Sequence, residues 1–112
     1  MSDIHAPIIK RVKSALLPLR IDDGTDLVKR GGQRTASVLM PLVQRGDNWQ
    51  VILTQRPMTM PRHPGQISFP GGRREDNETA LEAALRETEE EVGLPADAIT
   101  VLGRLPSFDA VS

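Results

Sequence analysis

The chain has 112 residues, the length of a single domain, so we do not expect a two-domain enzyme. Hydrophobic residues make up 38% and charged residues 26% of the sequence, which is typical of globular proteins and argues against a disordered or membrane-spanning chain. The absence of cysteine excludes disulfides, thiolate zinc ligands and a cysteine nucleophile, and it suits a cytoplasmic protein.

The net charge of −1 hides an asymmetry along the chain. Residues 1–74 contain 12 basic and 5 acidic side chains, whereas residues 75–91 contain 8 acidic side chains and one base, Arg86. Such an acidic segment is either a solvated surface or a binding site for cations, and the charge alone favours the solvated surface. Aromatic residues are scarce and no helix concentrates the basic residues, so we do not expect nucleic acid as a partner.

The first predicted element is a short amphipathic helix that begins at Pro7 and is closed by Pro18. Its basic side chains are expected to face solvent rather than a membrane. These side chains are Lys10, Arg11 and Lys13. Residues 20–34 are rich in aspartate, glycine and basic residues, which predicts a linker. We therefore expect residues 1–34 to be a helix and a linker, and residues 35–112 to form the main domain.

Two apolar runs at residues 36–43 and 49–54 are separated by Gly46, Asp47 and Asn48, a pattern that predicts a β-hairpin. Pro41 within the first run indicates an edge position or a bulge. The proline-rich residues 56–64 should form a loop, and residues 66–69 a short strand. The glycine pair at 71 and 72 is expected to adopt backbone conformations that other residues avoid.

The clearest helix is predicted for residues 79–92. Thr79 and Glu82 make a capping-box pattern at its start, and Gly93 followed by Pro95 marks its end. One stripe of this helix should pack on a core. The residues of the stripe are Leu81, Ala84, Leu85, Thr88 and Val92.

A second side of the same helix carries Glu87, Glu90 and Glu91, within about 100° of one another. We expect no basic side chain on this patch, so the three carboxylates should repel one another. Hard cations such as Mg²⁺ prefer oxygen ligands and commonly bind carboxylates together with substrate phosphates. The small side chains of the preceding turn should leave room for a ligand; they are Ala80, Ala83 and Ala84. The helix alone leaves a metal site and a solvated acidic surface equally open.

The spacing of residues 72–94 favours the metal site. Five residues separate Gly72 from Glu78, seven separate Glu78 from Arg86, and Glu-Thr-Glu-Glu-Glu-Val-Gly-Leu follows. This segment resembles the Nudix box, which has glycine, glutamate, Arg-Glu, Glu-Glu and glycine at these spacings. Every fixed residue matches, and the one departure is Thr88, which stands at an aliphatic position of the box.

The resemblance implies a loop, helix and loop that bind Mg²⁺ or Mn²⁺ and catalyse the attack of water on a diphosphate. It implies that the metal ligands are the carbonyl oxygen of Gly72 and the carboxylates of Glu87, Glu90 and Glu91. One of Glu90 and Glu91 would serve as the base, and Arg86 would orient the glutamates by ion pairing. Such a metal neutralises charge on phosphate oxygens and lowers the pKa of a bound water.

Residues 53–72 resemble the motif of the coenzyme A pyrophosphatase branch of the Nudix family. The residues in register are Leu53, Thr54, Arg56, Gly65, Phe69, Pro70, Gly71 and Gly72. Pro57 replaces a small residue of the motif and Pro61 replaces its second arginine, with Arg62 one residue late. The substrate contacts that the resemblance implies are Arg56, Arg62, Gly65, Phe69 and Gly71. Arg73 and Arg74 are further candidates, because guanidinium groups suit phosphate oxygens.

Nudix domains are α/β/α sandwiches around a mixed sheet, and we expect this α/β architecture for residues 35–112. Strands are expected at residues 38–43, 51–53, 66–69 and 99–105, with the box helix on one face of the sheet. Only 18 residues follow Leu94, so we expect a fold that is incomplete at its C-terminus. The other sheet face would then be an exposed apolar surface suited to a homodimer.

Three functions are compatible with these patterns. The first is a metal-dependent hydrolase of a small nucleotide substrate, which cleaves coenzyme A to 4′-phosphopantetheine and adenosine 3′,5′-bisphosphate. The second is a Nudix hydrolase of ADP-ribose, a dinucleotide or a nucleoside triphosphate, which the prolines at 57 and 61 favour. The third is a catalytically silent Nudix-like fragment that binds metal or a protein partner.

Overall fold

The computed structural model describes residues 6–16 and 35–106. The helices are α1 (Ala6–Ala15), α2 (Ala80–Val92) and the 3₁₀ turn η1 (Ala96–Ala98). The strands are β1 (Ala36–Val38), β2 (Leu42–Arg45), β3 (Asn48–Val51), β4 (Thr54–Gln55), β5 (Ile67–Ser68) and β6 (Gly71–Arg73). The helix predicted after Pro7 is confirmed as α1, and its three basic side chains are exposed. The predicted linker at 20–34 lies outside the described residues.

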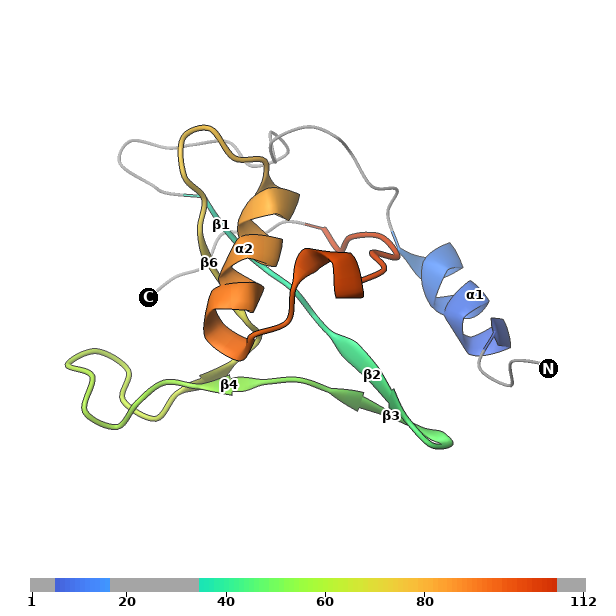
Figure 1. Cartoon of the computed structure of the whole chain (residues 1–112), viewed down its shortest axis with the longest axis horizontal. Helices are drawn as coiled ribbons and strands as arrows, with labels where there is room; N and C mark the ends of the chain where they lie inside the picture. The colour runs from blue at the N-terminus through green and yellow to red at the C-terminus, as the bar shows by residue number, and fades with distance from the viewer. Residues whose placement is uncertain (1–5, 17–34, 107–112) are drawn as a thin grey trace.

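The strands form three antiparallel pairs, β1 with β6, β2 with β3 and β4 with β5. The predicted α/β architecture is therefore confirmed, although no parallel pair of the expected mixed sheet occurs among the described strands. The β1–β6 pair joins distant parts of the chain, with Ala36 opposite Arg73 and Val38 opposite Gly71. Figure 1 shows α2 lying across this pair, while α1 lies apart from it.

The predicted hairpin is confirmed in its turn and wrong in the extent of its first strand. Leu42 lies opposite Val51 in the β2–β3 pair, and Gly46 in the turn has a φ of 60°. The apolar run at 36–43, with its strand expected at residues 38–43, is divided, because β1 ends at Val38 and pairs with β6, and β2 begins only at Leu42. Pro41 precedes β2 and is buried, and its carbonyl oxygen accepts a hydrogen bond from Ile52 at 3.2 Å. A proline cannot donate to a ladder, which accounts for the break.

The two glycines of β6 permit a close approach of neighbouring groups rather than an unusual backbone conformation. Neither Gly71 nor Gly72 has a positive φ, so the expectation of such conformations is wrong. A Cβ atom on Gly71 would lie 2.3 Å from the Ser37 carbonyl oxygen and 2.6 Å from Cα of Val38. Only glycine therefore allows β1 and β6 to pair at this distance.

Helix α2 begins and ends where the sequence predicts. The Thr79 hydroxyl accepts a hydrogen bond from the Glu82 N–H at 3.1 Å, and the Glu82 carboxylate accepts one from the Thr79 N–H at 2.8 Å. At the other end Gly93 takes a φ of 73°, and its N–H donates to the Glu89 carbonyl oxygen at 2.9 Å. These caps satisfy backbone groups that every helix end leaves free.

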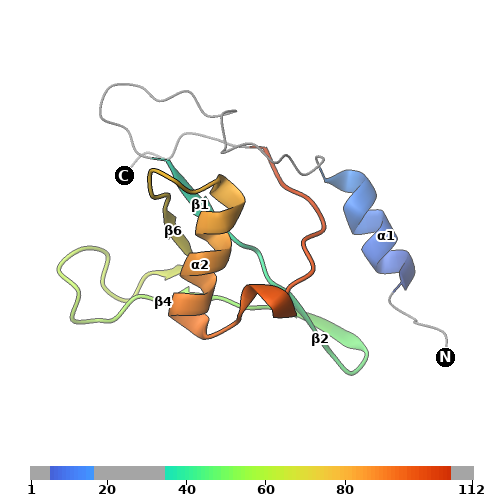
Figure 2. The ribbon, with the colours of Figure 1, turned by 45° about the horizontal axis from the view of Figure 1, so that its top comes forward.

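The core lies between α2 and the β1–β6 pair (Figure 2). Ala83 and Thr88 are fully buried and Ala84 is nearly so, and the Thr88 hydroxyl donates to the Ala84 carbonyl oxygen at 2.6 Å. The remaining members of the predicted stripe are half-buried. The stripe is therefore confirmed, with Ala83 as an additional member.

The alanines of the first turns leave no room for a ligand, so that expectation is wrong. Ala83 and Ala84 are buried where α2 packs on the strands. The Ser37 hydroxyl of β1 donates to the Ala80 carbonyl oxygen at 2.7 Å and holds the two elements together. Small residues here permit close packing of the helix on the sheet, and this packing fills the space that we expected for a ligand.

The strand predicted at residues 99–105 is also wrong, because the chain forms η1 and then an extended segment with a single bridge residue at Arg104.

Large apolar side chains are exposed on several described strands and their flanks; they include Val38, Met40, Leu42, Val51, Leu53 and Ile67. Val38 faces away from α2, since its neighbour Ser37 bonds to α2 and successive strand residues alternate sides. The homodimer stays a prediction. Within the described residues no helix has the length and hydrophobicity to span a membrane.

Candidate active site

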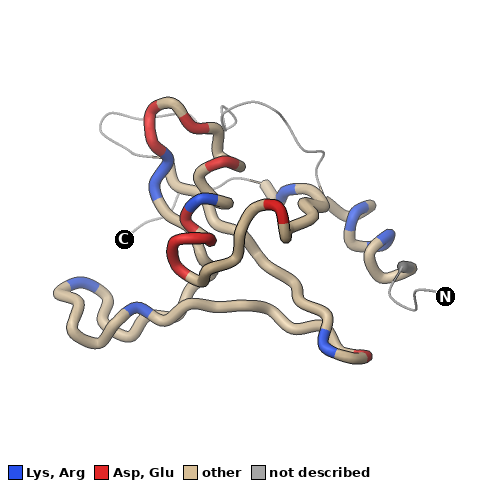
Figure 3. Tube along the Cα trace, in the orientation of Figure 1, with Lys and Arg blue, Asp and Glu red and all other residues tan. Residues whose placement is uncertain are grey.

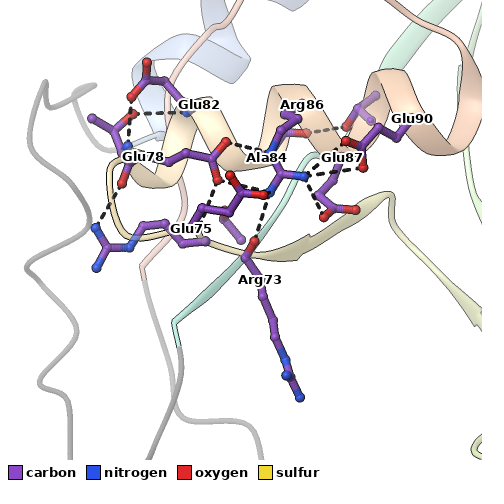
Figure 4. A network of polar contacts seen from close by, with 12 residues as sticks. Arg73, Glu75, Glu78, Glu82, Ala84, Arg86, Glu87 and Glu90 are labelled. Atoms are coloured by element: carbon purple, nitrogen blue, oxygen red, sulfur yellow. Dashed lines mark hydrogen bonds and ion pairs between the residues drawn. The ribbon is translucent and has the colours of Figure 1, made fainter.

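The segment from Gly72 to Leu94 folds into three adjoining parts: strand β6, the loop at 74–79 and helix α2. Figure 4 shows the polar network that joins them, with Arg86 at its centre. The capping box at Thr79 fixes the direction in which α2 leaves the loop, and the packing of α2 fixes its distance from β6. Local sequence therefore orients the acidic residues of α2 toward the glycine strand.

Arg86 and Glu78 form a two-point ion pair across the start of α2. The Arg86 Nε donates to one carboxylate oxygen of Glu78 at 2.6 Å, and Nη2 donates to the other at 3.0 Å. Both side chains are mostly shielded, with 27% and 15% of their surfaces exposed. The hydrogen bond from Arg86, and next that from the Glu75 N–H, lowers the pKa of Glu78, while its hydrogen bond to Glu78 raises the pKa of Arg86. Such paired, charge-assisted bonds are strong and directional.

The same guanidinium reaches the acidic patch of α2. Its Nη1 donates to Glu87 at 3.0 Å and to Glu90 at 3.3 Å, and its Nη2 donates to the Arg73 carbonyl oxygen at 3.1 Å. The expectation that no basic side chain lies on this patch is therefore wrong. A helical wheel gives the direction of a side chain's first bond, whereas a long arginine extends well beyond that direction.

The carboxylate of Glu87 lies against the backbone of Gly72. A Cβ atom on Gly72 would be 2.6 Å from Cδ of Glu87 and 2.9 Å from each of its oxygens. Glu91 lies beside them, where its carboxylate accepts a hydrogen bond from the Gly71 N–H. Two predicted carboxylate ligands therefore converge on the glycine strand.

The environment of Glu91 disfavours its negative charge. Partial desolvation is the largest cause that raises the pKa of Glu91, and the hydrogen bond from Gly71 opposes it. The charges of Glu87 and Glu90 and a hydrogen bond with Glu87 raise the pKa further. Carboxylates crowded in this way gain from a nearby cation, which relieves their repulsion.

The donor atoms fit a hard divalent cation, although no three acidic or histidine side chains of the described residues already stand in metal-binding geometry. The available donors are all oxygens, from the Gly72 carbonyl and from Glu87 and Glu91, which is the donor set of Mg²⁺ and Mn²⁺. Glu90 is turned toward Arg86 and is 57% exposed in its side chain. It would have to turn from Arg86 to join the other ligands.

The residues predicted to contact substrate fall into two groups. Arg56, Arg62 and Gly65 lie on the loop between β4 and β5, while Gly71 lies in β6 and Phe69, half-buried, precedes it. In Figure 3 the acidic end of α2 lies near the point where this loop leaves β4 and β5, and the basic positions of the loop lie farther from α2. The loop is thus joined to the glycine strand through β5 and Phe69.

The two arginines that follow the glycines differ in their surroundings. The Arg74 Nη1 donates to the Glu78 carbonyl oxygen at 2.9 Å, so this side chain braces the loop before α2. The side chain of Arg73 points away from the network in Figure 4 and is exposed. The structure therefore does not bring these two predicted phosphate contacts together.

Sequence reasoning assigned no role to Glu78, although the structure makes it the principal partner of Arg86. The signal was its fixed place in the box, six positions after Gly72 and eight before Arg86. Glu78 precedes the N-cap of α2, so the helical repeat does not place it beside Arg86. The contact between the two side chains depends on how the loop folds back against the helix.

Comparisons with known proteins identify relatives of the chain. Residues 33–112 match the family model of the NUDIX domain. The uncharacterized Nudix hydrolase NudL of Cronobacter sakazakii is 46% identical over 81 residues, which cover 71% of this chain and 42% of that protein. The protein of the same name from Escherichia coli K12 is 46% identical over 80 residues, covering 70% and 41%. That from Klebsiella aerogenes is 44% identical over 81 residues, covering 71% and 67%. The chain spans about two fifths of the length of the first two relatives.

Proposed function

The chain belongs to the Nudix family, and from this premise we propose that it hydrolyses a diphosphate bond in a nucleoside diphosphate derivative, with coenzyme A as its substrate. The products would be 4′-phosphopantetheine and adenosine 3′,5′-bisphosphate. We assign the reaction to residues 35–112, preceded by a helix and linker at 1–34, and place the protein in the cytoplasm.

The contact of Glu87 with the backbone of Gly72 carries this proposal. It brings an acidic helix within contact distance of a glycine strand, while Arg86 holds the helix through Glu78. Diphosphate hydrolysis needs negative charge neutralised at the phosphate and a water activated nearby. The oxygen atoms of Gly72 and Glu87 can hold a cation that would meet both requirements, and Arg86 holds the helix that carries Glu87 in place.

Nudix hydrolases generally use divalent metals such as Mg²⁺ or Mn²⁺. We propose that the carbonyl oxygen of Gly72 and the carboxylates of Glu87, Glu90 and Glu91 hold such a cation. When bound, the cation supplies charge neutralisation at the phosphate oxygens and a lower pKa for a coordinated water. Glu90 or Glu91 takes the proton of the attacking water, while the phosphorus–oxygen bond of the leaving phosphate breaks. Arg86 positions these glutamates.

The coenzyme A assignment is supported by the loop between β4 and β5 and by the glycine strand. Arg56, Arg62 and Gly65 lie on this loop, and the chain continues through Phe69 into Gly71. Arginine side chains on an exposed loop suit the phosphate groups of such a substrate.

A second candidate is the hydrolysis of ADP-ribose, a dinucleotide or a nucleoside triphosphate. Pro57 and Pro61 favour it, because they replace residues of the coenzyme A motif within the very loop that would recognise the substrate.

One assay panel separates these functions. The full chain is incubated with coenzyme A, ADP-ribose or a nucleoside triphosphate, each with Mg²⁺ or Mn²⁺, and the products are separated chromatographically. We expect coenzyme A to be cleaved with the highest kcat/KM. Comparable values for all three substrates would favour the second candidate. A folded chain that cleaves none of them would instead be a catalytically silent fragment.

A further inference from the structure

Ser37 of β1 connects the strand pair to the first turn of α2. Its hydroxyl donates to the Ala80 carbonyl oxygen at 2.7 Å, although the two residues are 43 positions apart in the chain. Both residues are half-buried, so the bond is partly shielded from competing water. In an α-helix such a carbonyl also accepts the N–H four residues further on, so Ser37 is a second partner for it. The bond therefore ties β1 to one defined point of the helix.

The place of Ser37 in β1 brings it next to the candidate site. In the β1–β6 pair Ser37 lies directly opposite Gly72. Residues opposite each other on paired strands share one face of the sheet, so the Ser37 side chain and the open side of Gly72 both face α2. The Glu87 carboxylate occupies that open side, with its Cδ 2.6 Å from the place of a Cβ atom on Gly72. One cross-strand pair thus contacts α2 at two points, Ala80 and Glu87.

These two points lie on one side of α2, two helical turns apart. Seven positions separate Ala80 from Glu87, which is about 10.5 Å along the axis and within about 20° of the same direction. The Ala80 carbonyl points toward the C-terminus of the helix and the Glu87 side chain points back toward its N-terminus, so the two approach each other. Because a helix is a rigid element over this length, a slide or rotation at Ala80 reaches Glu87. The bond to Ser37 therefore determines where along β6 the Glu87 carboxylate lies.

The bond of Ser37 differs in kind from two other bonds that hold α2 on the strands. The Arg86 guanidinium donates to the Arg73 carbonyl oxygen, and the Glu91 carboxylate accepts a hydrogen bond from the Gly71 N–H. Both of these bonds use side chains of the candidate site, which would change partners when a cation or a phosphate binds. The Ser37 bond joins a hydroxyl to the helix backbone, and neither group is a candidate ligand. It can therefore hold α2 in place while the site rearranges.

We propose that Ser37 is a positioning residue for the candidate site. Its bond to Ala80 sets the place of α2 along the β1–β6 pair and thereby brings the Glu87 carboxylate to Gly72. Ser37 lies outside the segment from Gly72 to Leu94, so the spacing of the box does not include it. The consequence for turnover rests on the proposed function, whereas the place of Glu87 does not.

The test compares Ser37→Ala with Ser37→Thr and Ser14→Ala in the full chain. Ser37→Ala removes the donor but leaves no acceptor unpaired, because the Ala80 carbonyl keeps its helical partner, so the chain should still fold. Ser37→Thr keeps a hydroxyl and suits a strand. Ser14→Ala is the matched control, since the Ser14 hydroxyl also donates to a backbone carbonyl, at 2.8 Å, but within α1. Circular dichroism checks the folding of each variant.

The first readout is the nuclear Overhauser contact between the Hα protons of Gly72 and the Hγ protons of Glu87, measured without metal or substrate. We expect Ser37→Ala to weaken it by about twofold or more, relative to the contact within the capping box of α2, because the helix can shift when the bond is lost. Ser37→Thr and Ser14→Ala should keep the intensity of the wild type. A bond that only stabilises the fold would lower the Tm of Ser37→Ala and leave this intensity unchanged, and that result would overturn the proposal.

The second readout is turnover of the best substrate of the assay panel, at saturating substrate and Mg²⁺. We expect the kcat of Ser37→Ala to fall by about tenfold, because a small displacement of groups at a reacting centre slows the reaction steeply, and Ser37→Thr should restore it. Full turnover by a Ser37→Ala chain with a weakened Overhauser contact would overturn the link to catalysis. A folded wild-type chain without turnover would overturn the proposed function, and the Overhauser contact would still decide the role of Ser37.

Discussion

The Glu87 carboxylate and the Gly72 backbone are in contact, because a Cβ atom on Gly72 would lie only 2.6 Å from Cδ of Glu87. The neighbouring Gly71 makes a contact of a different kind, since its Cβ would lie 2.3 Å from the backbone oxygen of Ser37. One glycine thus gives space to a side chain of the candidate site, and the other gives space to the paired strand. The candidate site therefore requires glycine at position 72, whereas the fold requires glycine at position 71.

We predict that alanine at Gly72 mainly lowers activity, whereas alanine at Gly71 mainly lowers stability. Gly72→Ala should displace the flexible end of Glu87, which changes the unfolding free energy by less than about 1 kcal/mol but lowers turnover at least tenfold. Gly71→Ala should cost more than about 2 kcal/mol, because backbone atoms of β1 must move. Denaturant unfolding and turnover of both variants measure this. Equal losses of stability would contradict the assigned contacts.

The Arg86–Glu78 pair predicts a dependence of stability on pH. The pKa of Glu78 in the folded chain lies below the ordinary value of 4.5, chiefly because Arg86 hydrogen-bonds to it. The stabilisation from this pair is therefore fully present above pH 4.5 and is lost as the pH falls through the lowered pKa. Glu78→Gln should lower the Tm near neutral pH, and its difference from the wild type should shrink in acid.

Thermal unfolding between about pH 7 and pH 3 tests this prediction for Glu78. Glu89→Gln is the matched control, because Glu89 is an exposed residue of α2 and the change removes the same charge. A Tm difference for Glu78→Gln that stays constant over the whole range would show that the ion pair does not stabilise the fold.

The parts of the fold that short-range rules determine were predictable from the sequence. The ends of α2 depend on Thr79, Glu82 and Gly93, which act within one turn, and the structure has these caps. The turn at Gly46 is similarly local. The division of the first strand was not predictable, because it depends on the pairing of Val38 with Gly71, more than thirty residues away. Periodicity alone does not report such partners.

The candidate site shows the same distinction. The sequence placed Glu87, Glu90 and Glu91 on one side of α2, but it did not show that Arg86 would extend over two of them. Nor did it show that Ala83 fills the space beside the helix. The direction of a helical side chain follows from its position, whereas its reach and its contacts depend on tertiary packing.

We predict that Mg²⁺ or Mn²⁺ raises the Tm more than NaCl of equal ionic strength, because only the folded chain brings these ligands together. A cation present at 100 times its Kd would stabilise the fold by about 2.7 kcal/mol. Glu87→Gln should abolish most of this increase and Glu89→Gln should preserve it. Differential scanning calorimetry provides the measurement. Equal Tm values in the two salts would remove the proposed metal site from this helix.

The last prediction concerns Glu90, which the structure connects to Arg86 over one helical turn. Glu90→Gln keeps the size and nearly the helix propensity of the residue, and the ion pair that it removes is exposed, so the unfolding free energy should fall by less than about 0.5 kcal/mol. Turnover should fall by about 10² to 10³, because a ligand of the cation or the base for the attacking water is lost. Turnover with saturating Mg²⁺, alongside circular dichroism of both chains and the Glu89→Gln control, measures the effect. A folded Glu90→Gln chain with the full turnover of an active wild type would exclude Glu90 from both roles.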